Sequence, residues 1–408
     1  MLRMKQLLRT TGVLLALFCL LPAYAAEEKK REAPQVDAAT GKRLNEAIEA
    51  VNAEKFAEAK VALSKLNPER LSPYELSRVE QMYASIASSE NNYPEASRRL
   101  QAAIATGGMD DAEILSARFQ IAQLFMVQEK WKEGVAALKQ WFAETPAPNA
   151  NAYYLLAIAY YRMDDHRNAV EPAQKAVDTS ENPQTNWIEL LLALRIEREE
   201  YAKALPLLKH LVQVAPEKRN NWMQLSAIYR QMEKYDEALA VTQVAYMAGH
   251  IVSESDLKAL ADLQAFAGVP YRAAKLLETK ISKGEINADG KTWEKVSYMW
   301  IASRDYKRAL PPLGKAAVMH NNGDLYVRMA EIELRNENWN AAETALNKAI
   351  QKGSLKNPGN SHLLLGITLF ERKETRKARA AFQKAAQFPN VAQQARTWIA
   401  HIDNTSKS

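Results

Sequence analysis

Cysteine is almost absent from this chain, since the one example, Cys19, lies close to the N-terminus. The residues around it have the layout of a secretory signal peptide, with a basic start, an apolar run at 13–21 and a small-x-small pattern ending at Ala25. Cleavage after Ala25 would remove Cys19 and leave no thiol for a disulfide or a thiolate metal ligand. We therefore predict a signal peptide at 1–25 and a periplasmic protein, with an uncleaved membrane anchor as the alternative.

Long apolar runs and a strong charge are also missing. The apolar run of the leader is far shorter than the ~20 residues that span a bilayer. No later stretch is apolar enough, so no stable membrane span is expected after cleavage. The net charge is +6, but the leader holds three of the 54 basic residues, which leaves 51 against 48 acidic ones. This balance does not indicate nucleic acid or anionic lipid as a partner.

Recognisable catalytic and metal-binding motifs are missing as well. The six histidines are dispersed, and none has a spacing typical of a zinc site. The segment 290–292 resembles the end of a phosphate-binding loop, but Glu285 occupies the position that requires glycine. No carboxylate pair stands out as a general acid and base. We predict no catalytic residue, no cofactor and no metal, with an enzyme of unrecognised site as the disfavoured alternative.

What the chain does contain is a repeated phrase between Gly41 and Asn390. An aromatic residue is followed by two others, a small residue and an apolar pattern of helical period, as in Tyr93–Ala96 and Trp131–Gly134. The small residues recur about every 35 residues, at 59, 96, 134, 169, 204, 238, 273 or 274, 309, 342 and 378. We expect each to lie where two helices approach closely, with larger apolar residues four positions later packing into the next unit.

Trp222, Leu225, Tyr229 and Ala238 follow a known consensus, and the sequence resembles the tetratricopeptide-repeat (TPR) family over nearly all of the chain after the leader. The resemblance implies an all-α solenoid of helix–turn–helix units, wound as a right-handed superhelix of about ten repeats. Single units cannot bury their apolar faces, so stacking supplies the core.

The same pattern divides the chain into segments. A charged, proline-containing stretch at 26–40 is expected to be a flexible linker. The TPR solenoid then occupies 41–390. An amphipathic pattern within 391–408 predicts a C-terminal capping helix followed by a short tail.

In TPR proteins the first helix of each unit lines a groove that binds partner proteins. A stripe of apolar and aromatic side chains from Phe119 to Tyr161 would suit a short helix or extended segment of a partner, although the same side chains would also suit gaps between units. A clamp for a chaperone's terminal carboxylate is not expected, because Asp262 follows Lys258 where such clamps have asparagine. Aligned on the small residues, the predicted groove positions are Phe119, Met126, Tyr154, Tyr161, Met223, Arg230 and Tyr298.

Two stretches, Leu66–Tyr83 and Trp131–Phe142, are similar to those of periplasmic TPR proteins associated with TonB energy-transduction systems. This resemblance implies an adaptor beside the TonB–ExbB–ExbD complex in outer-membrane uptake of iron complexes, with subunits of that complex or outer-membrane receptors as partners. A scaffold for envelope assembly or polysaccharide export is the alternative. The sequence indicates neither the oligomeric state nor the transported compound.

Overall fold

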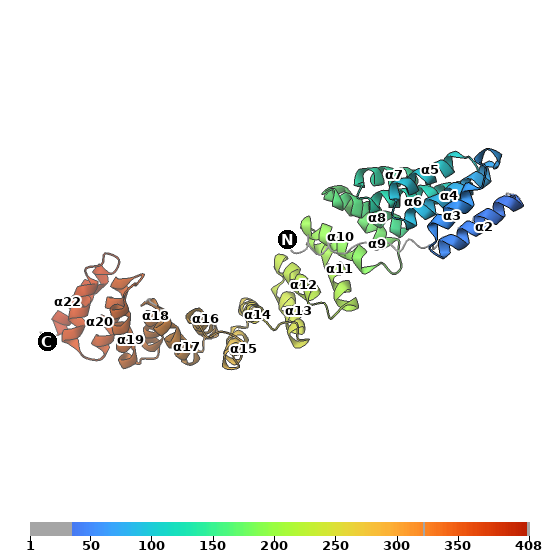
Figure 1. Cartoon of the computed structure of the whole chain (residues 1–408). Helices are drawn as coiled ribbons and strands as arrows, with labels where there is room; N and C mark the ends of the chain where they lie inside the picture. The colour runs from blue at the N-terminus through green and yellow to red at the C-terminus, as the bar shows by residue number, and fades with distance from the viewer. Residues whose placement is uncertain (1–34, 321–322, 406–408) are drawn as a thin grey trace. The chain divides into compact units, whose positions relative to one another are not determined.

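The computed structural model describes residues 35–320 and 323–405. The predicted signal peptide at 1–25 and most of the predicted linker at 26–40 therefore lie outside the described residues. Within those ranges the chain forms twenty-one α-helices and one short 3-10 helix, and no strand (Figure 1). The helices follow as ten helix–turn–helix segments and a final helix, α22 (Ala392–Thr405). The predicted all-α solenoid of about ten repeats with a C-terminal helix is confirmed.

Contacts divide the chain into two compact units, one ending at Pro172 and the other beginning at Ala173. The division falls inside α9 (His166–Asp178). The other helices of the first unit are α2 (Ala38–Asn52), α3 (Phe56–Ser64), α4 (Pro73–Ser89), α5 (Tyr93–Ala105), α6 (Asp111–Val127), α7 (Trp131–Glu144) and α8 (Ala150–Arg162), with the 3-10 helix η1 (Pro68–Arg70) between α3 and α4.

The second unit contains the remaining hairpins and the final helix α22. Each hairpin pairs a first and a second helix of about a dozen residues, joined by a short turn. These helices are α10 (Thr185–Glu197), α11 (Tyr201–Val214), α12 (Arg219–Gln231), α13 (Tyr235–Met247), α14 (Glu254–Phe266), α15 (Pro270–Ser282), α16 (Gly290–Ala302), α17 (Tyr306–Met319), α18 (Asp324–Arg335), α19 (Trp339–Lys352), α20 (Pro358–Glu371) and α21 (Thr375–Ala385).

One turn geometry recurs in all ten helix–turn–helix segments. The residue two positions before each second helix is left-handed, with φ between 56° and 79°. The next residue donates its N–H to a carbonyl five residues earlier, as Lys130 does to Phe125 at 2.9 Å. This is the Schellman arrangement, which satisfies carbonyls left open at a helix C-terminus. Gly268 is the one glycine among these left-handed residues, and each of the other nine accepts strain of about 1 kcal/mol.

The predicted close-approach positions are buried. The nine hairpins with alanine at this position expose none of its surface, and Gly134 is buried in the tenth. A Cβ added to Gly134 would lie 2.7 Å from the terminal methyl of Met126, so no larger residue fits there without movement. The apolar residues four positions later are also buried, which confirms the predicted packing: Leu100, Leu138, Leu208, Leu313, Leu346 and Phe382.

The start of the first described helix differs from the expectation. Helix α2 begins at Ala38, so the last three residues of the predicted linker at 26–40 are helical. The Asp37 carboxylate accepts the N–H of Ala39 at 2.9 Å and caps this end. The Asp37 N–H donates to Oε1 of Glu75 at 2.8 Å and ties the start of α2 to α4. Helical structure therefore begins before the linker boundary predicted at residue 40.

Candidate functional site

Two of the predicted groove residues in the first unit pack between helices α6 and α7. The Phe119 ring lies 4.9 Å from the ring of Trp141, a buried residue of α7. Met126 is 5% exposed and lies against Gly134. Met126 is therefore a core residue and not part of a surface groove, which corrects the prediction. Phe119 is half-buried and extends the same packing towards the surface.

The two predicted tyrosines of α8, Tyr154 and Tyr161, are both half-buried. The Tyr161 ring stacks on the His166 ring with centroids 5.0 Å apart and an interplanar angle of 21°. Tyr161 thus supports the turn into α9. Beside Tyr154, the Tyr153 ring stacks on Phe142 of α7 at 4.9 Å. The packing alternative therefore accounts for Tyr161, and a partner-binding role for this stripe stays a prediction.

The remaining predicted groove residues, Met223, Arg230 and Tyr298, lie on first helices of the second unit, and ion pairs connect these helices to one another. Nη2 of Arg219 on α12 lies 2.7 Å from Oδ1 of Asp256 on α14. Nζ of Lys295 on α16 lies 2.7 Å from Oδ2 of Asp262, also on α14. The Arg328 guanidinium of α18 lies over the ring of Tyr298 on α16. We call the side chains that join these four first helices, together with the exposed Arg230, the first-helix face: Arg219, Arg230, Asp256, Asp262, Lys295, Tyr298 and Arg328.

Tyr298 and Arg230 present their side chains to solvent on this face. Tyr298 is 42% exposed, and the Arg328 guanidinium lies 5.9 Å from its ring centroid. Its hydroxyl donates to Oε1 of Glu294 at 3.0 Å. Burial of the hydroxyl and this bond to Glu294 raise the pKa of Tyr298, so the side chain is neutral at physiological pH. Met223, by contrast, packs against the apolar core of this unit.

The two residues that would form a carboxylate clamp are engaged elsewhere. Nζ of Lys258 lies 2.7 Å from Oε1 of Glu254, one helical turn earlier. Asp262 is bound by Lys295, as above. The Lys258 ammonium is therefore paired within its own helix, and the absence of a carboxylate clamp stays a prediction.

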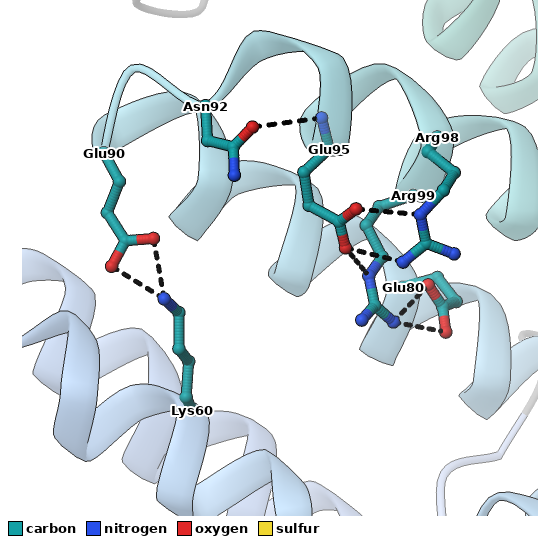
Figure 2. Close-up of polar contacts among 7 residues, drawn as sticks. All are labelled: Lys60, Glu80, Glu90, Asn92, Glu95, Arg98 and Arg99. Atoms are coloured by element: carbon teal, nitrogen blue, oxygen red, sulfur yellow. Dashed lines mark hydrogen bonds and ion pairs between the residues drawn. The ribbon is translucent and has the colours of Figure 1, made fainter.

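The most perturbed carboxylate of the first unit belongs to a structural ion-pair network (Figure 2). Glu95 on α5 accepts hydrogen bonds from Arg98 at 2.6 and 2.8 Å and from Arg99 at 2.7 Å. These bonds, from Arg98 first and then Arg99, lower the pKa of Glu95 to about 2. Arg99 also donates to Glu80 of α4 at 3.1 Å. A carboxylate so firmly ionised and so fully bonded is a poor general acid or base, and the network instead joins α4 to α5.

Residues 35–320 and 323–405 contain neither a metal-binding cluster nor a helix suited to span a membrane. No group of three or more His, Cys, Asp or Glu side chains in these ranges is placed to hold a metal ion. No helix in these ranges combines the length and the apolar character that crossing a bilayer requires.

Residues 327–392 match the family model described as tetratricopeptide repeat. Residues 118–264 match the model described as ChAPs, the Chs5p-Arf1p-binding proteins. The comparison with curated proteins gave no match.

Solved structures similar to this chain include a tetratricopeptide repeat protein from Parabacteroides merdae ATCC 43184. It is 12% identical, with 73% of this chain and 100% of that chain covered and a TM-score of 0.38. YrrB, described as a TPR protein with an unusual peptide-binding site, is 17% identical over 40% of this chain and 82% of its own, with a TM-score of 0.34. MamA from Desulfovibrio magneticus RS-1 is 17% identical over 45% and 99%, with a TM-score of 0.37.

The order of helical hairpins, their recurrent turn, the buried small residues and the family match over residues 327–392 agree with one another. The described chain is an all-α helical solenoid of the tetratricopeptide-repeat type.

Proposed function

We propose that this chain is a protein-interaction scaffold, and that the first-helix face of its second unit binds a segment of a partner protein. Solenoids of this type are typical of non-enzymatic interaction proteins. The observation that carries the proposal is the set of side-chain pairs that links four consecutive first helices, from Arg219–Asp256 to Arg328 over Tyr298. These pairs hold the face in place before a partner arrives, which lowers the entropic cost of binding.

The exposed residues of the face suit such a role. Tyrosine and arginine are enriched among the residues that contribute most to binding energy at protein interfaces. Tyr298 offers a ring held in position by Glu294 and Arg328, and Arg230 offers an exposed guanidinium. Around them, Lys295 pairs with Asp262 and Arg219 with Asp256, so the arginines that remain favour a partner segment that carries some acidic residues.

We further propose that the scaffold works in the periplasm as an adaptor of a TonB-type uptake system. The support comes from the sequence. The layout of residues 1–25 is that of a signal peptide, and residues 66–83 and 131–142 resemble periplasmic TPR proteins associated with TonB systems. The partner would be a subunit of the TonB–ExbB–ExbD complex or an outer-membrane receptor. An envelope-assembly or polysaccharide-export scaffold would use the same face with another partner.

Site-specific photocrosslinking in living cells tests both parts of the proposal. A photoreactive amino acid replaces Arg230 or Tyr298, and a matched control carries it at Val214, which is 54% exposed at the end of a second helix. We expect TonB-complex subunits or their receptors to be captured from the first two positions and not from Val214. Capture of export or cell-wall proteins from the same positions would keep the face and discard the TonB assignment. Equal capture from all three positions would refute the proposal that the first-helix face binds the partner.

A charge-reversal variant gives an independent check. Arg230→Glu with Tyr298→Ala should weaken capture of the identified partner about tenfold or more, because both side chains belong to the contact. The melting temperature should change little, since Arg230 is exposed and Tyr298 is 42% exposed. A drop in melting temperature like that of a core variant would show that Tyr298 is a packing residue instead.

A further inference from the structure

A cleft of about 1100 Å³ opens among the turns of the second unit, away from the residues of the first-helix face. One wall is the α16–α17 turn at Arg304 and Asp305, and another is the α18–α19 turn at Glu337. Tyr271 of α15 lines the cleft as well. The cleft is broad and open to solvent, which suits a segment of an extended polymer better than an enclosed small molecule.

Two tyrosine rings that line the cleft are held in place by neighbouring arginine and tryptophan side chains. Nη1 of Arg308 donates to the Tyr271 hydroxyl at 2.8 Å, and the Tyr271 ring meets the Trp300 ring edge-on at 5.2 Å. The Arg335 guanidinium lies 5.1 Å from the centroid of the Tyr306 ring and donates to its hydroxyl at 3.3 Å. Because both hydroxyl oxygens already accept a bond, their hydrogens are available to donate to a ligand.

Planar polar groups on the α18–α19 turn add unused hydrogen-bonding capacity. Nδ2 of Asn338 donates to Oε2 of Glu333 at 3.0 Å and orients both side chains. Within the described part of the chain, the second oxygen of Glu333 and the amide oxygen of Asn338 accept no other hydrogen bond and can serve as acceptors. The Asn336 side chain has no partner among the described residues and offers both a donor and an acceptor.

The charges of the cleft argue against an ionic ligand. Three carboxylates, from Asp305, Glu333 and Glu337, stand beside Arg304 and Lys307, and the guanidiniums of Arg308 and Arg335 reach the two tyrosine hydroxyls. Cations and carboxylates therefore nearly balance, so a ligand with a strong charge of one sign finds no excess of the opposite charge here. Among residues 35–320 and 323–405 no carboxylate group is arranged to hold a metal ion. A peptide would find a single aliphatic residue, Leu310, against which to bury an apolar side chain.

We propose that this cleft binds a neutral oligosaccharide. The apolar C–H faces of sugar rings would stack on Tyr271 and Tyr306, since aromatic faces attract polarised C–H groups. Vicinal hydroxyls would pair with the amides of Asn336 and Asn338 and with the Glu333 carboxylate. The site would give the scaffold a glycan contact in addition to the partner protein, and it does not depend on the first-helix face.

Isothermal titration of the purified protein with cellohexaose, maltohexaose and chitohexaose tests this proposal. We expect saturable binding of at least one hexasaccharide. Asn336→Ala and Tyr271→Ala should weaken it about tenfold, or 1.4 kcal/mol, whereas Tyr271→Phe, which keeps the ring, should weaken it less. The matched control is Glu199→Ala, a left-handed residue of the α10–α11 turn outside the cleft, which should leave binding unchanged.

The outcomes separate the alternatives. Among the described residues the Asn336 side chain has no hydrogen-bond partner, so Asn336→Ala should keep the melting temperature and tests binding even if Tyr271→Ala unfolds the hairpin. No saturation with any of the three sugars would overturn the proposal. So would equal weakening by Glu199→Ala, or tighter binding of a sulfated hexasaccharide or of an octapeptide library. Because no partner protein is present, failure here leaves the crosslinking result for the first-helix face unaffected.

Discussion

Two helix-interior glycines of this solenoid should respond in opposite ways to the same substitution. Gly366 lies on α20, and a Cβ built there would meet ring atoms of Phe382 at 2.5 Å. Gly314 lies on α17, and its Cβ would meet the terminal methyl of Met329 at 3.6 Å, an ordinary contact. Alanine should therefore destabilise the protein at Gly366 and stabilise it at Gly314.

The magnitudes follow from packing and helix propensity. Alanine in place of glycine inside a helix gains about 1 kcal/mol. At Gly366 the Phe382 ring has no exposed surface and stacks on Trp398 with centroids 5.5 Å apart, so it has no room to retreat. Overpacking of that kind costs about 1–3 kcal/mol, and we expect the upper end. The net result is a loss of about 2 kcal/mol for Gly366→Ala and a gain of about 1 kcal/mol for Gly314→Ala.

Urea unfolding monitored by circular dichroism measures both changes. Hydrogen exchange of α20 to α22 localises them, because repeat units can unfold in steps. Shrinking the ring with Phe382→Leu should cost less in the Gly366→Ala background than in the native protein, with a coupling of about 1 kcal/mol. The reasoning is refuted if Gly366→Ala stabilises the protein, or if the two substitutions at Gly366 and Phe382 are additive.

Three further predictions concern the turns, the ion pairs and the tyrosine stripe. Glu129→Gly should stabilise the first unit by up to about 1 kcal/mol in urea unfolding, because φ at this residue is 57° and glycine adopts that value without strain. Gly268→Ala, at a φ of 79°, should destabilise the second unit by a similar amount. Effects of equal sign would contradict this. The pKa of Glu95 is lowered from 4.5 to about 2, so its contribution to folding stability is complete above pH 4.5 and is lost as the pH falls towards 2. Glu95→Gln should therefore remove about 0.5 kcal/mol of the acid-induced loss of stability, a small value because the ion pairs are partly exposed. An unchanged acid titration of stability would contradict this. Tyr161→Ser should lower the melting temperature through its lost stack on His166, and an unaltered melting curve would restore the groove interpretation.

The candidate site was only partly predictable. Arg230 and Tyr298 lie on exposed positions of first helices, as a helical period of 3.6 leads one to expect, whereas their role in binding a partner stays a prediction. Met126 has the same helical phase but a glycine opposite, and its long flexible side chain fills the space that Gly134 leaves. The periodicity of one helix does not show how much space the facing helix leaves for a side chain.

The sequence by itself determined the repeat unit. A small residue about every 35 positions marks where two helices approach closely, and this spacing allows only a repeated helical hairpin. Only the tertiary structure decided how each hairpin turns and how neighbouring first helices are joined. Nine of the ten turns place a residue other than glycine in the left-handed region, where packing and the Schellman bonds outweigh local preference. Arg219 and Asp256 are 37 positions apart in the sequence. The stacking of whole hairpins brings Nη2 of Arg219 to 2.7 Å from Oδ1 of Asp256.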